Sequence, residues 1–291
     1  MKNINIFCFG FGQVAKNFIK KINLENFNIS LSTTSRNETE KKKFGKINYT
    51  SFKFDGDSFD PKINERIQKS QYILISIPPR DGTDLVFKTF SKVIENSKVK
   101  WVTYLSATSV YGDHKGNWVS ENSNTKPTSA NGLSRLHAER LWMSFYLKKN
   151  LPLQIFRLSG IYSNENNVLE RLKFGKVKII NKKNHFFSRV HVEDISNILF
   201  KSLTKFKPGE IYNISDDKPA PSQDVTLYGV KLLNIAKPNS IKVKDIENEM
   251  LKNFYKDSKK VSNKKMKDFF NYSLVYPSYI EGLNYISNNQ V

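Results

Sequence analysis

The sequence of 291 residues contains a single cysteine, Cys8, and has no long apolar run. One cysteine cannot form an intramolecular disulfide, and no cysteine–histidine spacing indicates zinc, so we expect no metal site. A membrane-spanning helix needs about 20 consecutive apolar residues, which this chain lacks. Met1 leads almost directly into an expected strand, without the layout of a signal peptide. These absences predict a cytoplasmic protein with Cys8 as a small core residue.

Acidic residues are few compared with basic ones. The chain has 47 lysines and arginines against 27 aspartates and glutamates, a net charge of +20, and such a balance raises the question of a nucleic-acid partner. The lysines are spread along the whole chain, however, without an arginine-rich arm or an aromatic RNA-binding motif. A groove for anionic substrates is one use of this charge, but a solvated lysine surface is the simpler interpretation. We therefore do not expect nucleic-acid binding.

The most informative stretch is IFCFGFGQVAKNF, residues 6–18, which is typical of a buried strand, a glycine turn and a helix. Gly10, Gly12 and Ala15 fit the pattern G-x-G-x-x-G/A. In that pattern the first glycine permits a tight turn, the second lets a pyrophosphate approach the backbone, and the third small residue lets the helix pack on the strand. The helix N-terminus then presents N–H groups and partial positive charge to the phosphates. The stretch predicts a dinucleotide-binding turn.

The expected second strand, NISLSTTS (residues 28–35), ends in Ser35 and is followed by Arg36. It lacks the terminal carboxylate that holds the ribose 2′-hydroxyl of NAD. A hydroxyl beside a guanidinium suits a 2′-phosphate, because arginine binds phosphate through a planar fork of donors. This pair favours NADP, with NAD still possible. The alternative is that Arg36 is one more surface cation.

Short apolar strands alternate with amphipathic helix-like stretches, which is typical of βαβ units and a parallel sheet. Further strands are expected at residues 48–55, 71–79, 99–108, 152–160 and 209–215, and helices around residues 61–69, 83–97 and 133–149. Asp194 is expected to cap a helix that begins at Ile195.

This order predicts an α/β fold, a Rossmann-type doubly wound parallel sheet with a smaller C-terminal substrate lobe. We expect the nucleotide-binding domain to comprise residues 1–160 together with 186–207. The smaller lobe is expected to comprise residues 161–185 and 208–291. The ligand belongs at the carboxyl ends of the strands, near the point where the strand order reverses.

Nine segments between about residue 3 and residue 283 occur in a telling order: GFGQVA, the IPP after the fourth strand, YLSATSVYGDHKGNWVSE, SANGLSRLHAER, RLSGIY, VHVEDI, IYNISDD, KKVSNKKMK and YPSYIEGL. Together they resemble an extended short-chain dehydrogenase/reductase of the atypical, NAD-dependent epimerase/dehydratase-like branch. With the tip of the second strand, the resemblance implies a cofactor site formed by Gly10, Phe11, Gly12, Gln13, Val14, Ser35, Arg36, Ile77, Pro78, Pro79, Arg135, Leu158, Ser159 and Gly160.

Active members of this family use a serine or threonine near the end of the fifth strand, and a tyrosine followed four residues later by a lysine. The resemblance places Ala107, Asn131 and Arg135 at these three positions. A methyl group cannot hydrogen-bond substrate, and an amide cannot become a phenolate. Arg135 can donate to a ribose but cannot act as a neutral base, since its pKa stays above about 12. The usual proton relay is therefore substituted here.

Replacement catalytic groups are available nearby. Ser106 and Thr108 flank Ala107, and Tyr111 lies just beyond, so these three are our candidate catalytic residues. An aromatic residue in such a turn also serves simply as packing. His114 and His137 are acid–base candidates on chemistry alone. His137 follows Arg135 by two residues, so we expect the two side chains to point to different faces of the helix.

His191 has a family context of its own. In sugar-nucleotide members an arginine that contacts the substrate diphosphate precedes the matching histidine by four residues, and here that position is Phe187. Arg189 is two residues out of step and shares the strand face of His191. We expect His191 to be a buried histidine bonded to a nearby backbone group.

The resemblance implies an NADP(H)-dependent oxidoreductase or epimerase that acts on a small or sugar-like carbonyl or hydroxyl substrate. The substituted triad keeps open an alternative, a dinucleotide-binding sensor or partner-binding module without turnover. The sequence specifies neither the small-molecule substrate nor the oligomeric state.

Overall fold

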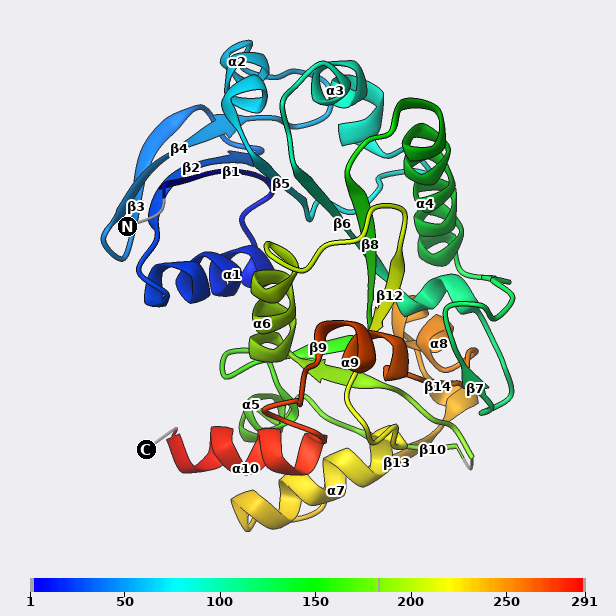
Figure 1. Cartoon of the computed structure of the whole chain (residues 1–291). Helices are drawn as coiled ribbons and strands as arrows, with labels where there is room; N and C mark the ends of the chain where they lie inside the picture. Colours follow the sequence, from blue (N-terminus) through cyan, green and yellow to red (C-terminus); the bar gives the residue numbers. More distant parts are fainter. Residues whose placement is uncertain (1–2, 183, 290–291) are drawn as a thin grey trace. The chain divides into compact units, whose positions relative to one another are not determined.

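A computed structural model of the chain describes residues 3–182 and 184–289 (Figure 1). It divides into two compact units. Unit 1 comprises Met1–Ala107, Leu133–Arg157 and Ile195–Tyr212, and unit 2 comprises Thr108–Gly132, Leu158–Asp194 and Asn213–Val291. Residues 1–2, 183 and 290–291, which belong to the two lobes expected from the sequence, lie outside the described residues. The boundaries of those lobes stay predictions.

A central sheet of eight strands forms the base of the fold, in the order β12-β8-β6-β5-β1-β2-β4-β3. Strand β1 pairs in parallel with β2 and β5, β2 with β4 and β5 with β6, whereas β3 pairs antiparallel with β4. The strands are β1 (Asn3–Phe9), β2 (Asn28–Ser35), β3 (Glu40–Phe44), β4 (Ile47–Lys53), β5 (Tyr72–Ile75), β6 (Trp101–Ala107), β8 (Leu153–Leu158) and β12 (Ile211–Ile214). This arrangement confirms the Rossmann-type α/β fold.

Helices cover both faces of the sheet in unit 1 (Figure 1). They are α1 (Gln13–Leu24), α2 (Lys62–Lys69), α3 (Leu85–Glu95), α4 (Ala130–Lys149) and α6 (Val192–Ser202). The apolar stripes of α2, α3 and α4 supply Ile67, Phe90 and Trp142 to a core that also contains Phe9 and Tyr104 from the strands. Because β2 and β5 lie on opposite sides of β1, the strand order reverses at β1, which is where nucleotide-binding folds of this kind place their ligand.

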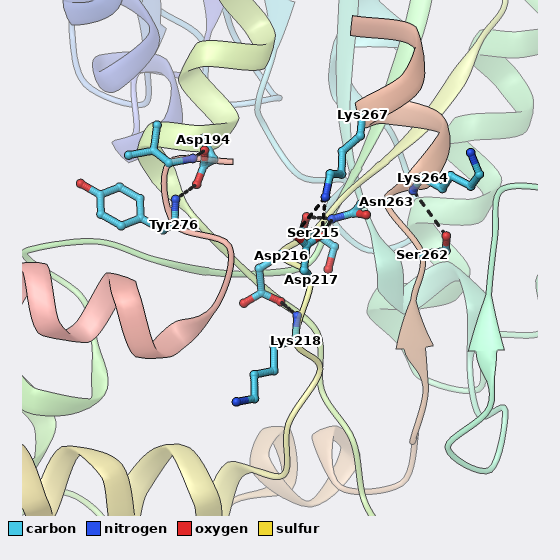
Figure 2. Close-up of polar contacts among 11 residues, drawn as sticks. Asp194, Ser215, Asp216, Asp217, Lys218, Ser262, Asn263, Lys264, Lys267 and Tyr276 are labelled. Atoms are coloured by element: carbon cyan, nitrogen blue, oxygen red, sulfur yellow. Dashed lines mark hydrogen bonds and ion pairs between the residues drawn. The ribbon is translucent and has the colours of Figure 1, made fainter. Parts of the chain in front are cut away.

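The expected cap of α6 is wrong. The helix begins at Val192 rather than Ile195, so Asp194 lies inside its first turn. Its carboxylate instead accepts hydrogen bonds from the backbone N–H groups of Val275 and Tyr276, at 2.8 and 3.0 Å. A partner about eighty residues later in the chain thus replaces the local capping bond (Figure 2).

Unit 2 consists of short elements. The strands pair in parallel as β7 (Trp118–Val119) with β14 (Lys260–Val261), β9 (Gly160–Tyr162) with β11 (Arg189–His191), and β10 (Ile179–Asn181) with β13 (Ser240–Lys242). Its helical elements are η1 (Thr108–Tyr111), α5 (Val168–Lys173), α7 (Ser222–Leu233), η2 (Val243–Asp245), α8 (Glu249–Phe254), α9 (Lys264–Phe270) and α10 (Tyr279–Asn289). An apolar core joins α5, α7 and α10 through Leu169, Val225 and Leu283.

Across residues 3–182 and 184–289, no helix combines the length and apolar character needed to cross a membrane. The same residues contain no cluster of three or more histidine, cysteine, aspartate or glutamate side chains able to hold a metal ion.

Candidate functional site

The turn after β1 requires glycine at its first position. Gly10 has φ of +84°, a conformation that residues with a Cβ rarely adopt. A Cβ there would lie 2.9 Å from Ser76 Oγ and 3.1 Å from a side-chain carbon of Ile77. The N–H of Gly10 donates to Thr34 Oγ1 at 2.9 Å, which ties the turn to β2. Neighbouring strands on both sides therefore fix the turn.

Gly12 differs from Gly10, because its surroundings are open. A Cβ at Gly12 would meet no atom within 4 Å. Gly12 is also the residue before α1, where no side chain caps the helix and no acidic residue lies in the first turn. The N–H groups and partial positive charge at this helix end suit a phosphate. The turn therefore fits a dinucleotide, which Gly12, Gln13 and Val14 would hold through backbone N–H groups.

Phe11 lies between these glycines, and its ring packs at 5.4 Å from Phe44 and 5.2 Å from Tyr49, measured between ring centroids. These contacts connect the turn with the β3–β4 hairpin. The IPP segment follows β5, and its Ile77 borders Gly10, whereas Pro78 is exposed.

The tip of β2 presents the two residues on which cofactor choice was predicted to depend. Arg36 is exposed. The Oγ of Ser35 is buried and has no hydrogen-bond partner within the described residues. A buried hydroxyl without a partner costs free energy unless a ligand or water satisfies it. The tip thus offers a hydroxyl and a guanidinium to whatever binds there.

Two of the three substituted positions, Ala107 and Arg135, lie in unit 1. Ala107 ends β6, and the Oγ of Ser106 beside it is buried without a partner among the described residues. Arg135, on α4, donates a hydrogen bond to the backbone carbonyl oxygen of Leu105 and contacts the hydroxyl of Tyr104. Burial raises the pKa of Tyr104 above its ordinary value, so this phenol stays protonated.

The remaining candidates belong to unit 2. Tyr111 ends η1 and is fully buried, and its hydroxyl donates to Asn213 Oδ1 at 2.7 Å. Asn131, at the tyrosine position of the family pattern, is exposed on the first turn of α4. Thr108 begins η1 and is half-buried. The hydroxyl of Tyr111 is thus already used in a buried hydrogen bond between two side chains.

Three further predicted features are the LSG segment, His137 and His114. The segment comprises Leu158, Ser159 and Gly160; the first two are buried, and the Ser159 Oγ lacks a partner within the described residues. His137 is exposed on α4, and the Nε2 of His114 lies 3.1 Å from the carbonyl oxygens of Tyr111 and Asn124.

His191 is a buried histidine bonded to a nearby backbone group, as expected. Its Nδ1 accepts from the N–H of Glu193 at 3.3 Å, and its ring packs at 4.1 Å from that of Tyr276 and 5.0 Å from that of Tyr162. Burial lowers its pKa to about 4. The ring is therefore neutral near pH 7.

Arg189 also lies in the interior of unit 2, where its guanidinium forms hydrogen bonds with protein atoms. It donates to the carbonyl oxygens of Phe187 and Ala220, at 3.2 and 3.0 Å, and to Ser222 Oγ at 3.2 Å. This arrangement joins the strand around Arg189 to the start of α7.

Sequence reasoning assigned no role to a polar network that joins two late segments (Figure 2). The side-chain amide of Asn263 donates to the carbonyl oxygen of Ser215 at 2.8 Å and to Asp217 Oδ1 at 2.7 Å. Lys267 forms an ion pair with Asp217 at 2.9 Å. The segments IYNISDD and KKVSNKKMK contain these residues, so their joint occurrence was the available signal. The network attaches the start of α9 to the end of β12.

A model of the NAD dependent epimerase/dehydratase family matches residues 87–215. A conserved protein of unknown function from Silicibacter pomeroyi has a similar structure, with a TM-score of 0.82, 30% identity and 99% of each chain covered. The chain belongs to the epimerase/dehydratase family. The resemblance inferred from the sequence segments is thereby confirmed.

Two named proteins are similar to this family member. A dTDP-D-glucose 4,6-dehydratase from Dictyostelium discoideum is 27% identical over 222 residues, 64% of this chain and 50% of that protein, so the chain spans about half the length of this curated relative. The dTDP-glucose 4,6-dehydratase of Bacillus anthracis, solved in complex with NAD, is 18% identical with a TM-score of 0.77, over 99% of this chain and 96% of that one. At 18% identity, the similarity to the Bacillus anthracis protein shows a shared fold alone.

Proposed function

We propose that this epimerase/dehydratase family member binds NADP(H) at the turn after β1 and acts as an oxidoreductase or epimerase on a small or sugar-like carbonyl or hydroxyl substrate. The observation that carries the proposal is the open space at Gly12 before an uncapped α1. A pyrophosphate placed there gains N–H donors and the helix dipole without displacing a side chain. A bound nicotinamide cofactor supplies reversible hydride exchange with a carbonyl or hydroxyl carbon.

The preference for NADP over NAD rests on the tip of β2. The hydroxyl of Ser35 lacks a partner among the described residues, and Arg36 is exposed. A 2′-phosphate would accept hydrogen bonds from both, whereas the tip has no carboxylate for a ribose 2′-hydroxyl. NAD, to which a structural relative is bound, is the alternative cofactor.

The substrate class is inferred from the named relatives, both dehydratases of a sugar nucleotide. In the proposed arrangement the Rossmann part holds the cofactor, and residues 161–185 and 208–291 contribute the substrate lobe. Arg189 does not offer this lobe an unoccupied guanidinium, because it already bonds two carbonyl oxygens and a serine hydroxyl. A diphosphate would have to be held by other cations of the lobe.

The proposed catalytic residues are Ser106, Thr108 and Tyr111. Hydride arrival at a carbonyl leaves charge on its oxygen, which a hydroxyl donor stabilises. Ser106 is the strongest of the three, since its Oγ is free among the described residues, whereas the hydroxyl of Tyr111 already donates to Asn213. Arg135 contributes positive charge near β6 and transfers no proton.

A second function, dinucleotide binding without turnover, is favoured by one observation. The guanidinium at the family's lysine position bonds the carbonyl oxygen of Leu105, a structural use of the side chain. In this alternative the chain senses the redox state of the cofactor or presents it to a partner.

Oxidation of NADPH with a panel of aldehydes, ketones and nucleotide-linked keto-sugars distinguishes the two. We expect slow oxidation that depends on the carbonyl compound and falls at least about tenfold in Ser106→Ala. NADPH that binds stoichiometrically but is oxidised with none of the panel would support the sensor. Thr204→Ala, which changes an exposed hydroxyl outside the site, is the matched control.

A further inference from the structure

A basic hollow is lined by residues of β2, β3, β4 and α2, at the edge of the central sheet that ends with β3. Its volume is about 640 Å³. The register places Ser32 opposite Thr50, and Thr50 opposite Lys41. Because side chains alternate between the faces of a sheet, Lys43 lies on the same face as Lys41. Hydroxyl groups therefore form the floor of the hollow, and lysines form its outer side.

Arg66 completes the hollow from a different element. It lies on α2 and lines the space together with Lys41 and Lys43. Across residues 3–182 and 184–289, the side chains of these three cations make no hydrogen bond or ion pair. Like charges brought together raise each other's energy, so an anion bound among them is stabilised.

Three lysines near the hollow form ion pairs. Lys42 pairs with Glu40 at 2.7 Å, and Lys53 pairs with Glu38 at 2.6 Å. On α2 the ammonium of Lys69 pairs with Glu65. Within the described residues, Lys41, Lys43 and Arg66 remain without an ion pair, as do Lys46 in the β3–β4 turn and Lys62 at the start of α2.

Lysines on an edge strand also discourage pairing with another sheet. That effect explains cations on β3, but it requires neither an arginine from α2 nor a floor of hydroxyl groups. The volume lies within the range of small-molecule sites, about 300–1,000 Å³. Lysine, a forked arginine and hydroxyl donors are the groups that recognise phosphate oxygens.

We propose that this hollow binds a small molecule that carries two or more linked phosphate groups. The site is separate from the turn after β1, because none of residues 10–14 lines it. Lys41 and Lys43 contact the phosphates from β3, Arg66 holds one of them from α2, and the hydroxyls of Ser32 and Thr50 donate from the floor.

Calorimetric titration with inorganic triphosphate, in buffer containing saturating NADPH, tests the proposal. The cofactor occupies the turn after β1 and so removes it as a phosphate site. We expect one triphosphate per chain, and affinity about tenfold lower in Lys41→Gln/Lys43→Gln and in Arg66→Gln, as loss of charge-assisted bonds implies. The control is Lys92→Gln/Lys98→Gln, which removes the same charge from exposed lysines outside the hollow.

Affinity that falls equally in the control would contradict the proposal, since a general charge effect would then explain it. Unchanged affinity in the hollow variants, or triphosphate that no longer binds once NADPH is present, would also overturn it. Single-stranded RNA that binds more tightly than triphosphate and is lost in the same variants would assign the surface to nucleic acid instead. Native thermal transitions of all variants establish that each is folded.

Discussion

The guanidinium of Arg135 donates a hydrogen bond to the backbone carbonyl oxygen of Leu105. Arg135 occupies the position at which the family pattern has its lysine, and Leu105 lies on β6 two residues before Ala107. The side chain thereby fastens the start of α4 to the end of β6. A residue expected to face the cofactor is thus bound to the strand that leads into the substituted triad.

We predict that Arg135→Ala lowers the free energy of unfolding by about 1–2 kcal/mol, because a charge-assisted hydrogen bond is lost. Arg135→Lys should retain part of that stability and much of the affinity for NADPH. Urea denaturation and cofactor titration measure the two effects. Arg140→Ala, on the same helix but exposed, should change stability by less than about 0.5 kcal/mol. Equal losses in both alanine variants would disprove a specific role for the bond.

Cofactor choice should depend on Arg36. NADPH should bind more tightly than NADH, and Arg36→Ala should weaken NADPH binding by about 1–3 kcal/mol through lost charged hydrogen bonds, with little effect on NADH. Fluorescence titration of both cofactors measures this difference. Lys98→Ala, an exposed cation elsewhere, should alter neither affinity. Equal binding of NADPH and NADH to the unaltered protein would reject the preference.

His191 should make the stability of the protein depend on pH. Its ordinary pKa is 6.5, and burial lowers the pKa to about 4. As the pH falls from about 6.5 to about 4, the unfolded chain binds a proton at His191 that the folded chain does not bind, so the free energy of unfolding decreases. The contribution is complete above about pH 6.5 and is lost as the pH approaches 4.

The measurement is the free energy of unfolding at intervals between pH 7.5 and pH 4.5. The slope should be smaller in His191→Gln, which removes the titratable ring, than in the unaltered protein. His185, whose burial also lowers its pKa to about 4, should leave a residual slope. The control is His137→Gln, which changes an exposed histidine; a reduction in slope there as large as that in His191→Gln would refute the assignment.

Restoring the family triad should raise carbonyl reduction. The triple variant Ala107→Ser, Asn131→Tyr, Arg135→Lys supplies a substrate donor, a phenol and a lysine at the family positions. If these substitutions alone limit turnover, NADPH oxidation with the carbonyl panel should increase about a hundredfold or more, the lower end of the range for acid–base catalysis. Unaltered protein that already turns over at about 10 s⁻¹, a typical enzyme value, would show that other residues replace the triad.

The turn after β1 and the strands around it were predictable because their determinants are local. The positive φ of Gly10 and the open surroundings of Gly12 belong to one short segment. The apolar runs of the central strands indicate that these strands are buried. The strand at residues 28–35 has the bounds expected. Prolines, which lack an N–H donor, shorten the strand expected at 71–79 to Tyr72–Ile75.

Some of the features missed depend on partners distant in the chain. The carboxylate of Asp194 accepts hydrogen bonds from the hydroxyl of Tyr272, at 2.6 Å, and from two backbone N–H groups that follow it. Capping propensity describes the neighbouring residues alone and cannot reveal such a bond. The lysine-rich strand β3 was missed for a different, local reason: its charged sequence has no apolar alternation, although the turn at Gly45, with φ of +58°, folds it onto β4.

The most direct test of the account is NADPH binding by Gly12→Val, compared with the unaltered protein and with Gly10→Ala. A side chain at Gly12 would enter open space, so the variant should unfold cooperatively at nearly the original temperature yet bind no NADPH. Gly10→Ala should instead lose about 1–3 kcal/mol of stability, because its φ is positive and its Cβ would meet Ser76. Normal NADPH binding by Gly12→Val would contradict the assignment of the turn after β1 as the cofactor site.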